Sequence, residues 1–197
     1  MKRRMEYLYH LAEASNLRSI LKHGLMSAER LVGMTQISEP ERKCILRGHR
    51  PGNVRLSEDV LIRDQRPMPP AALAKALDGD LDPADWYALL NGFVFFWLDR
   101  ERMDRQRSAC GTRPQVVLTF DASALLDRFG VEAFVSPINS GNARRKAARR
   151  RRDTFVPYRA WSQRGWPTGR RTRPPAECLF RCVIPTRAPY LVSVTKV

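Results

Sequence analysis

Apolar positions in this chain fall into short blocks whose spacing switches between that of a strand and that of a helix. The first block, Glu6 to Ser27, predicts an aromatic strand that ends at His10, then a turn, then a helix over Asn16–His23. Gly24 is suited to the left-handed conformation that ends such a helix, and Ser15 or Asn16 can cap its start. A strand that ends at His10 would leave the imidazole beside a turn, where it can meet a ligand.

The remaining blocks predict further short strands and helices in an irregular order. Strands are expected at 54–56, 60–63, 93–98, 115–120, 131–135, 176–184 and 190–194, and helices at 69–77, 83–91, 100–108 and 122–129. Asp82, Asp99 and Asp121 stand where helix N-caps are expected. Because strands and helices do not alternate regularly, we predict an α+β fold, with a bent, mostly antiparallel sheet split into two halves and helices on its flanks. The length suits one domain, 1–197.

The net charge indicates what kind of partner this chain binds. It has 35 Lys and Arg, most of them arginine, against 20 Asp and Glu, which gives a net charge of +15. Guanidinium groups bind phosphates bidentately and release counterions from nucleic acid. The excess therefore favours a polyanionic partner, with a general solubilising charge as the alternative.

The segment 142–173 concentrates this charge, with twelve basic residues and one acid, Asp153. Aromatic residues interleave with the bases, a mixture that suits single-stranded nucleic acid because rings stack on bases for ~1–3 kcal/mol each. The residues predicted to bind nucleic acid are Arg144, Arg145, Lys146, Arg149, Arg150, Arg151, Arg152 and Trp161. The same segment could instead be a mobile, solvated loop, because like charges in a block repel.

Membrane and metal sites are not expected. No apolar run approaches the roughly 20 residues needed to cross a bilayer, and the N-terminus lacks the apolar stretch of a secretory signal. We therefore expect a cytoplasmic protein. The four cysteines are scattered, and Cys178 and Cys182 have no second His/Cys pair nearby that would complete a zinc site.

The opening of the chain resembles a known enzyme family. Tyr9–Ser27 carries the pattern Y-H-x-x-x-x-x-N-L-x-S-I-L-x-x-G-L-x-S, which resembles the opening of the DarT-type ADP-ribosyltransferases. It is more loosely similar to the PARP/diphtheria-toxin group and to the RNA 2'-phosphotransferases. The resemblance implies that His10 binds a ribose hydroxyl of NAD.

A second segment of resemblance is the strand over 93–98, which is nearly all apolar and aromatic. DarT-like proteins have a strand of the type V-P-F-Y-F at this place, and PARP-like enzymes stack a tyrosine on the nicotinamide. This chain has Phe95, Phe96 and Trp97 but no tyrosine, so the resemblance implies stacking without a hydroxyl role. Alternation along a strand places Phe95 and Trp97 on one face.

A third segment is the late strand AECLFRCVI over 176–184, which resembles the A-E-V-L-V strand of DarT-like transferases. By this resemblance Glu177 is the catalytic residue. Arg63, with Arg66 in reserve, matches a basic segment whose arginine faces the nucleotide. Cleavage of the bond between nicotinamide and ribose develops positive charge on the sugar, which one carboxylate can stabilise without a metal.

Together these segments predict an NAD-dependent ADP-ribosyltransferase that modifies a base in nucleic acid, DNA rather than RNA, in a single strand or flipped from a duplex. A toxin or phage-defence effector with an antitoxin partner fits by family analogy alone. Two alternatives stay open. An RNA 2'-phosphotransferase would need further histidine and arginine contacts to RNA, and the remaining histidines, His23 and His49, match no motif of that group. A catalytically inactive, basic nucleic-acid-binding module on the same fold would explain the missing tyrosine.

Overall fold

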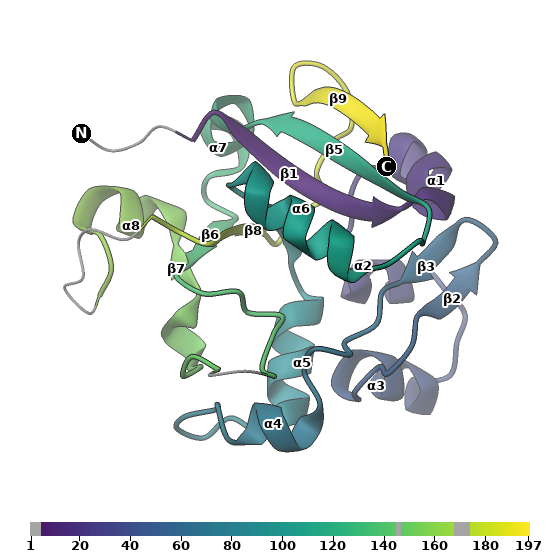
Figure 1. Cartoon of the computed structure of the whole chain (residues 1–197), viewed down its shortest axis with the longest axis vertical. Coiled ribbons are helices and arrows are strands. Elements are labelled where there is room, and N and C mark those ends of the chain that lie inside the picture. The colour runs from purple at the N-terminus through teal and green to yellow at the C-terminus, as the bar shows by residue number, and fades with distance from the viewer. Residues whose placement is uncertain (1–4, 145–146, 168–173) are drawn as a thin grey trace.

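The computed structural model describes residues 5–144, 147–167 and 174–197 (Figure 1). The fold is α+β. Its main element is a seven-stranded antiparallel sheet with the strand order β7-β6-β8-β4-β1-β5-β9. These strands are β1 (Tyr7–Glu13), β4 (Val94–Trp97), β5 (Gln115–Asp121), β6 (Ala133–Ser136), β7 (Val156–Pro157), β8 (Glu177–Phe180) and β9 (Leu191–Lys196). A separate hairpin joins β2 (Val54–Ser57) to β3 (Val60–Ile62).

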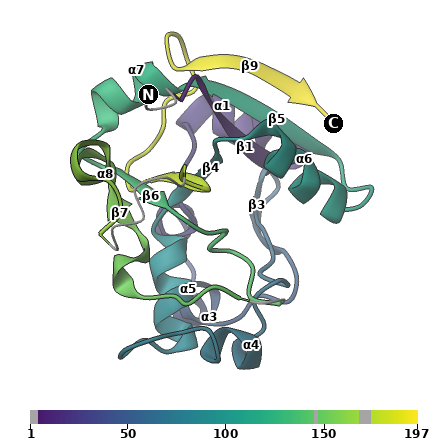
Figure 2. The ribbon, with the colours of Figure 1, turned by 60° about the vertical axis from the view of Figure 1, so that its left-hand side comes forward.

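The sheet is divided at the junction of β1 and β4. β1 pairs with β5 along all seven of its residues, from Tyr7 to Glu13. β1 and β4, in contrast, pair at Tyr9 and Trp97 alone. One half of the sheet is therefore β1, β5 and β9, and the other is β4, β8, β6 and β7, as the turned view shows (Figure 2). This arrangement confirms the predicted split, antiparallel sheet.

Helices flank both halves of the sheet. They are α1 (Leu17–His23), α2 (Ala28–Gly33), α3 (Glu39–Arg47), α4 (Pro70–Ala74), α5 (Pro83–Asn91), α6 (Arg100–Ala109), α7 (Ala122–Phe129) and α8 (Tyr158–Arg164), with short 3-10 turns η1 (Ala14–Asn16) and η2 (Arg152–Thr154). α3, α4 and α5 gather at the end of the molecule away from β9, and α6 lies along β1 (Figure 1). No helix in the described part of the chain is long and apolar enough to cross a membrane.

The expected N-caps are present. The side chains of Asp82, Asp99 and Asp121 each accept a hydrogen bond from a backbone amide in the first turn of α5, α6 and α7. Gly24 ends α1 with a φ of 85°, and a Cβ there would lie 2.8 Å from the carbonyl oxygen of Ile184. That close approach ties α1 to the segment after β8 and requires glycine on steric grounds as well.

Several boundaries differ from the predictions. β1 does not end at His10 but continues to Glu13, because its last residues pair with β5. Asn16 does not cap α1. Its side-chain amide instead exchanges two hydrogen bonds with the backbone of Leu61 in β3, at 2.8 and 2.9 Å. This contact fixes the β2–β3 hairpin beside the end of β1.

Other differences concern whole elements. α2 and α3 were not expected, although Ser27 and Ser38 cap them in the usual way. The segment 142–173, considered as a mobile loop, contains η2, β7 and α8 within its described residues. The strand expected over 176–184 is shorter, since β8 ends at Phe180.

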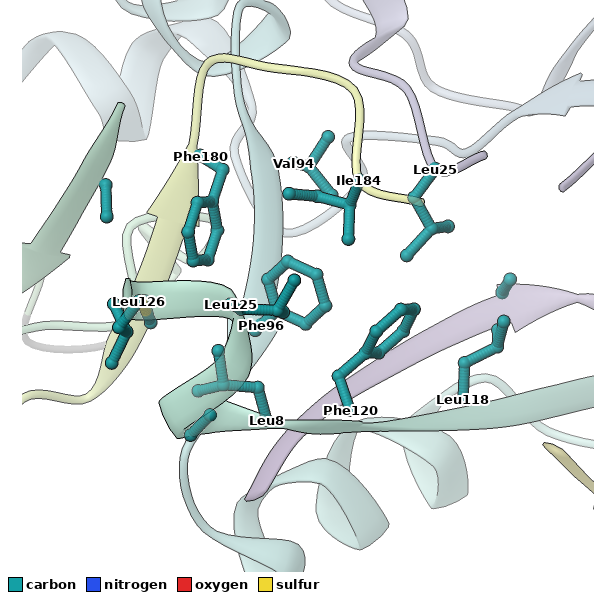
Figure 3. Close-up of a cluster of buried hydrophobic side chains, with 14 of the residues drawn as sticks. Leu8, Leu25, Val94, Phe96, Leu118, Phe120, Leu125, Leu126, Phe180 and Ile184 are labelled. Atoms are coloured by element: carbon teal, nitrogen blue, oxygen red, sulfur yellow. The ribbon is translucent and has the colours of Figure 1, made fainter. Parts of the chain in front are cut away.

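Aromatic rings pack the core beneath the divided sheet (Figure 3). Phe96 of β4 makes edge-on contacts with Phe120 of β5 and Phe180 of β8, at ring-centroid distances of 5.4 and 5.6 Å. Its side chain is only 1% exposed. Phe96 thus connects both halves of the sheet where backbone pairing between them is almost absent.

Phe96→Ala should lower the free energy of unfolding by about 3–5 kcal/mol, because it leaves a cavity between the two halves. Urea denaturation would measure the loss. Leu21→Ala, at a position in α1 that is 49% exposed, is the control and should change stability by less than about 0.5 kcal/mol. Similar losses of stability in the two variants would contradict the conclusion that Phe96 connects the two halves of the sheet.

Candidate active-site cleft

A large cleft opens where β1 and β4 diverge. Its volume is about 1420 Å³, larger than the roughly 300–1,000 Å³ of ordinary small-ligand pockets. Its walls come from β1, β3, β4 and α6 and from the loops after β3 and β6. Residues predicted from the sequence to form the site and found along this cleft are His10, Arg63, Arg66, Phe95, Phe96, Trp97, Arg144 and Glu177.

His10 lies in the middle of β1 with its imidazole in the cleft wall. Nδ1 lies 2.8 Å from the carbonyl oxygen of Phe95, and because a carbonyl can only accept, Nδ1 carries the proton. Burial, above all, lowers the pKa of His10 to about 4, and the charge of Arg63 acts in the same direction. At neutral pH the ring is therefore uncharged and Nε2 is an acceptor, suited to a ligand hydroxyl.

Glu177 is the first residue of β8 and is only 4% exposed. Both of its carboxyl oxygens accept a hydrogen bond from the backbone amide of Ser140, at 3.2 Å each. Burial raises the pKa of Glu177 to about 7, although the hydrogen bonds from Ser140 and the charges of Arg150 and Arg102 oppose the rise. A carboxyl group with this pKa can act as base or acid near neutral pH.

The aromatic residues of β4 divide between two faces. Phe95 and Trp97 are half-buried and, as predicted, alternate with the buried Phe96. Trp97 is paired with Glu177 across β4 and β8, which puts an aromatic ring beside the carboxyl group. The prediction that Phe96 stacks on a ligand is wrong, because its side chain is packed in the core.

The two arginines expected to face a nucleotide are placed differently. Arg63 forms an ion pair with Glu13, Nε to Oε1 at 3.2 Å, and donates to the carbonyl of Leu11. Arg66 is exposed and donates from Nε to the carbonyl of Pro51 at 3.0 Å. Arg63 thus fixes the end of β1, and Arg66 lies at the cleft rim.

Arg150 corrects the nucleic-acid prediction. Its side chain is fully buried, with a relative exposure of 0%, so it cannot contact a polyanion. Its guanidinium donates to the carbonyl oxygens of Asn139, Asn142 and Ala148. These bonds hold the loop whose Ser140 amide contacts Glu177. Arg150 therefore positions Glu177 indirectly, through this loop.

The other residues predicted to contact nucleic acid belong to the same segment, 142–173. Arg149 and Arg151 both pair with Asp78, at 3.0 and 2.8 Å, and Arg152 pairs with Asp80 at 3.4 Å. Trp161 packs against Tyr158 and Trp166. Arg144 is exposed and lines the cleft. Arg145 and Lys146 lie outside the described residues.

Sequence reasoning missed Ser140 and the role of Arg150. The polar loop 136–141 was visible in the sequence, but no local signal marks which amide meets Glu177. In the described residues no group of three or more His, Cys, Asp or Glu side chains could hold a metal ion.

The molecule is thus an α+β protein with a divided antiparallel sheet and a cleft walled by a neutral histidine, aromatic rings and a buried glutamate. The chain belongs to DUF7002, a family of unknown function, whose model matches residues 6–191. A search of curated proteins found no match to it.

Arg150→Gln should destabilise the fold by about 3 kcal/mol, because three loop carbonyls lose a buried charged donor. Arg149→Gln, one residue away and exposed, removes the same charge and should cost less than about 1 kcal/mol. Urea denaturation of both variants tests the assignment. Equal losses of stability in the two variants would mean that the buried hydrogen bonds of Arg150 do not stabilise the fold more than an exposed arginine does.

Glu177→Gln should make stability less dependent on pH. The pKa of Glu177 is raised in the folded state, so the wild-type protein loses stability as pH rises from about 4.5 to about 7. The variant cannot ionise and does not lose this stability. Its free energy of unfolding relative to the wild-type protein should therefore rise by roughly 3 kcal/mol across that window. Denaturation at pH 4.5 and pH 8 measures the change, and a constant difference would refute the raised pKa.

Proposed function

We propose that this protein is an NAD-dependent ADP-ribosyltransferase that transfers ADP-ribose to a base in nucleic acid. The observation that carries the proposal is that His10 and Glu177, near opposite ends of the chain, line one cleft together with Phe95 and Trp97. These are the positions at which the sequence resembles the DarT-type transferases. A divided antiparallel sheet of the expected kind adds support.

The ribose and the nicotinamide of NAD would be held by side chains whose chemistry suits each of them. Nε2 of His10 is an uncharged acceptor for a ribose hydroxyl, because Nδ1 is already committed to the carbonyl of Phe95. Phe95 and Trp97 offer rings to the nicotinamide. Since neither ring carries a hydroxyl, they can supply stacking but no hydrogen bond.

In the reaction, the bond between ribose C1' and the nicotinamide nitrogen breaks, and its electron pair passes to the pyridinium ring and neutralises it. Positive charge develops at C1', and the carboxylate of Glu177 stabilises it. A nitrogen of the acceptor base then attacks C1' and gives up a proton, which Glu177 accepts. A pKa of about 7 suits both tasks, since the group is largely ionised just above neutral pH and can still take up a proton.

The acceptor is assigned to nucleic acid because of charge. The chain carries +15, and exposed arginines such as Arg66 and Arg144 lie along the cleft. We further propose that the protein acts in the cytoplasm as a toxin or phage-defence effector, controlled by an antitoxin protein.

Glu177→Gln should abolish transfer while leaving the protein folded, because the amide cannot supply negative charge or accept the proton. Wild-type activity should rise with pH to a plateau, with an inflection near pH 7, since the ionised form of Glu177 is the active one. Radiolabelled NAD incubated with DNA, RNA and protein acceptors measures both effects. Glu41→Gln, an exposed position in α3, is the matched control and should keep full activity.

The acceptor that becomes labelled decides between functions. Label on DNA or RNA supports the proposal, and full activity of Glu177→Gln would reject the catalytic assignment. Loss of a 2'-phosphate from RNA would favour the phosphotransferase. Salt-sensitive nucleic-acid binding with intact NAD would favour the inactive binding module.

A further inference from the structure

One face of α6 borders the cleft. Arg102, Arg105, Gln106 and Ala109 all line it, and their spacing of three, four and seven residues is that of a single helix face. Arg100 and Arg107 of the same helix are not among the cleft-lining residues. α6 therefore presents two of its four arginines to the cleft and directs the other two elsewhere.

The rings proposed to stack on the nicotinamide lie next to this face. The indole Nε1–H of Trp97 donates to Oε1 of Gln106, so the strand that carries Phe95 and Trp97 is tied to the arginine-bearing face of α6. Arg102 also lies close enough to Glu177 to influence its charge. Basic side chains, half-buried aromatic rings and the buried carboxyl group thus line one cleft.

The Arg149–Arg152 run is poorly placed for the same purpose. Arg150 is buried beneath the loop that carries Ser140, and Arg149 and Arg151 share the carboxylate of Asp78. None of the four residues lines the cleft. The Arg149–Arg152 run therefore lies on a different part of the molecule from the cleft.

We propose that the cleft-facing side of α6, with Arg102 and Arg105, holds the phosphate backbone of a single-stranded nucleic acid and directs one base into the cleft, toward the ribose of the NAD whose nicotinamide is held by Phe95 and Trp97. Arg144, on the loop that follows β6, extends this surface at the cleft. The inference rests on the proposed function and deepens it by locating the acceptor. A single strand is favoured over a duplex because a base must be out of its stack to reach the reacting ribose inside the cleft.

The ion pairs of α6 do not stand in the way. Arg102 pairs with Asp99 at 3.8 Å and Arg105 with Glu101 at 3.1 Å, and all four side chains are at least 40% exposed. Pairs of this kind within an exposed helix are weak. A phosphate can replace each carboxylate as partner, with release of counterions from the strand.

The test is the binding of a fluorescent single-stranded oligodeoxynucleotide to the full-length protein, without NAD, over a range of salt concentrations. Arg102→Gln/Arg105→Gln should bind roughly tenfold more weakly at physiological salt and reduce the salt slope by about 1.4, the value for two lost phosphate contacts. Arg100→Gln/Arg107→Gln removes the same charge from the same helix and is the matched control. Its affinity should fall less than about threefold, because only the general field changes.

Two outcomes would overturn the surface assignment. One is equal weakening by the two double variants, and the other is a larger loss for Arg149→Gln/Arg151→Gln/Arg152→Gln than for the cleft-facing pair. Transfer of label from NAD to the same oligonucleotide separates this proposal from the proposed function. Absence of both transfer and NAD hydrolysis in the wild-type protein, with the predicted binding pattern intact, would reject the transferase but not the surface. A raised KM for NAD in Arg102→Gln/Arg105→Gln, with oligonucleotide binding like the control's, would assign these arginines to the donor instead.

Discussion

The divergence of β1 from β4 is the constraint on which the rest of the molecule depends. Beyond the single pair at Tyr9 and Trp97, the two strands no longer satisfy each other's backbone groups, and buried polar groups need other partners. The carbonyl of Phe95 is met by the imidazole of His10, which fixes the ring's tautomer and leaves Nε2 as an acceptor. Phe96 meanwhile packs between the two halves and replaces the missing hydrogen bonds with apolar contacts. The divergence of the two strands therefore both opens the cleft and fixes the orientation of His10.

A second feature is the pair of charged groups buried on either side of one loop. Arg150 binds the loop's carbonyls, and the loop in turn presents the Ser140 amide to Glu177. Burial of either charge alone is costly. The structure meets that cost with backbone partners rather than a direct ion pair, and burial still raises the pKa of Glu177 to about 7. Glu177 is thus both rigidly placed and able to change protonation near neutral pH.

The arginines that give the chain its positive charge divide into those that support the fold and those that lie at the surface. Arg63 closes the end of β1 through Glu13, and Arg150 organises a loop from inside. Arg149 and Arg151 share Asp78 away from the cleft, whereas Arg102 and Arg105 of α6 line the cleft together with the aromatic rings of β4. Net charge alone favours a polyanionic partner, but it does not say which surface would bind one.

Much of this protein was determined by short-range sequence patterns. The caps at Asp82, Asp99 and Asp121, the two neighbouring strands β2 and β3 and the glycine that ends α1 depend on residues a few positions apart, and all were predicted. The extent of β1 was not, because its last residues are set by pairing with β5 some hundred positions away. The burial of Arg150 and Phe96, and the placement of His10 and Glu177 along the same cleft, follow from how distant segments pack in the folded chain. Burial and proximity are properties of segments distant in sequence, and local spacing carries no information about which distant segments will meet.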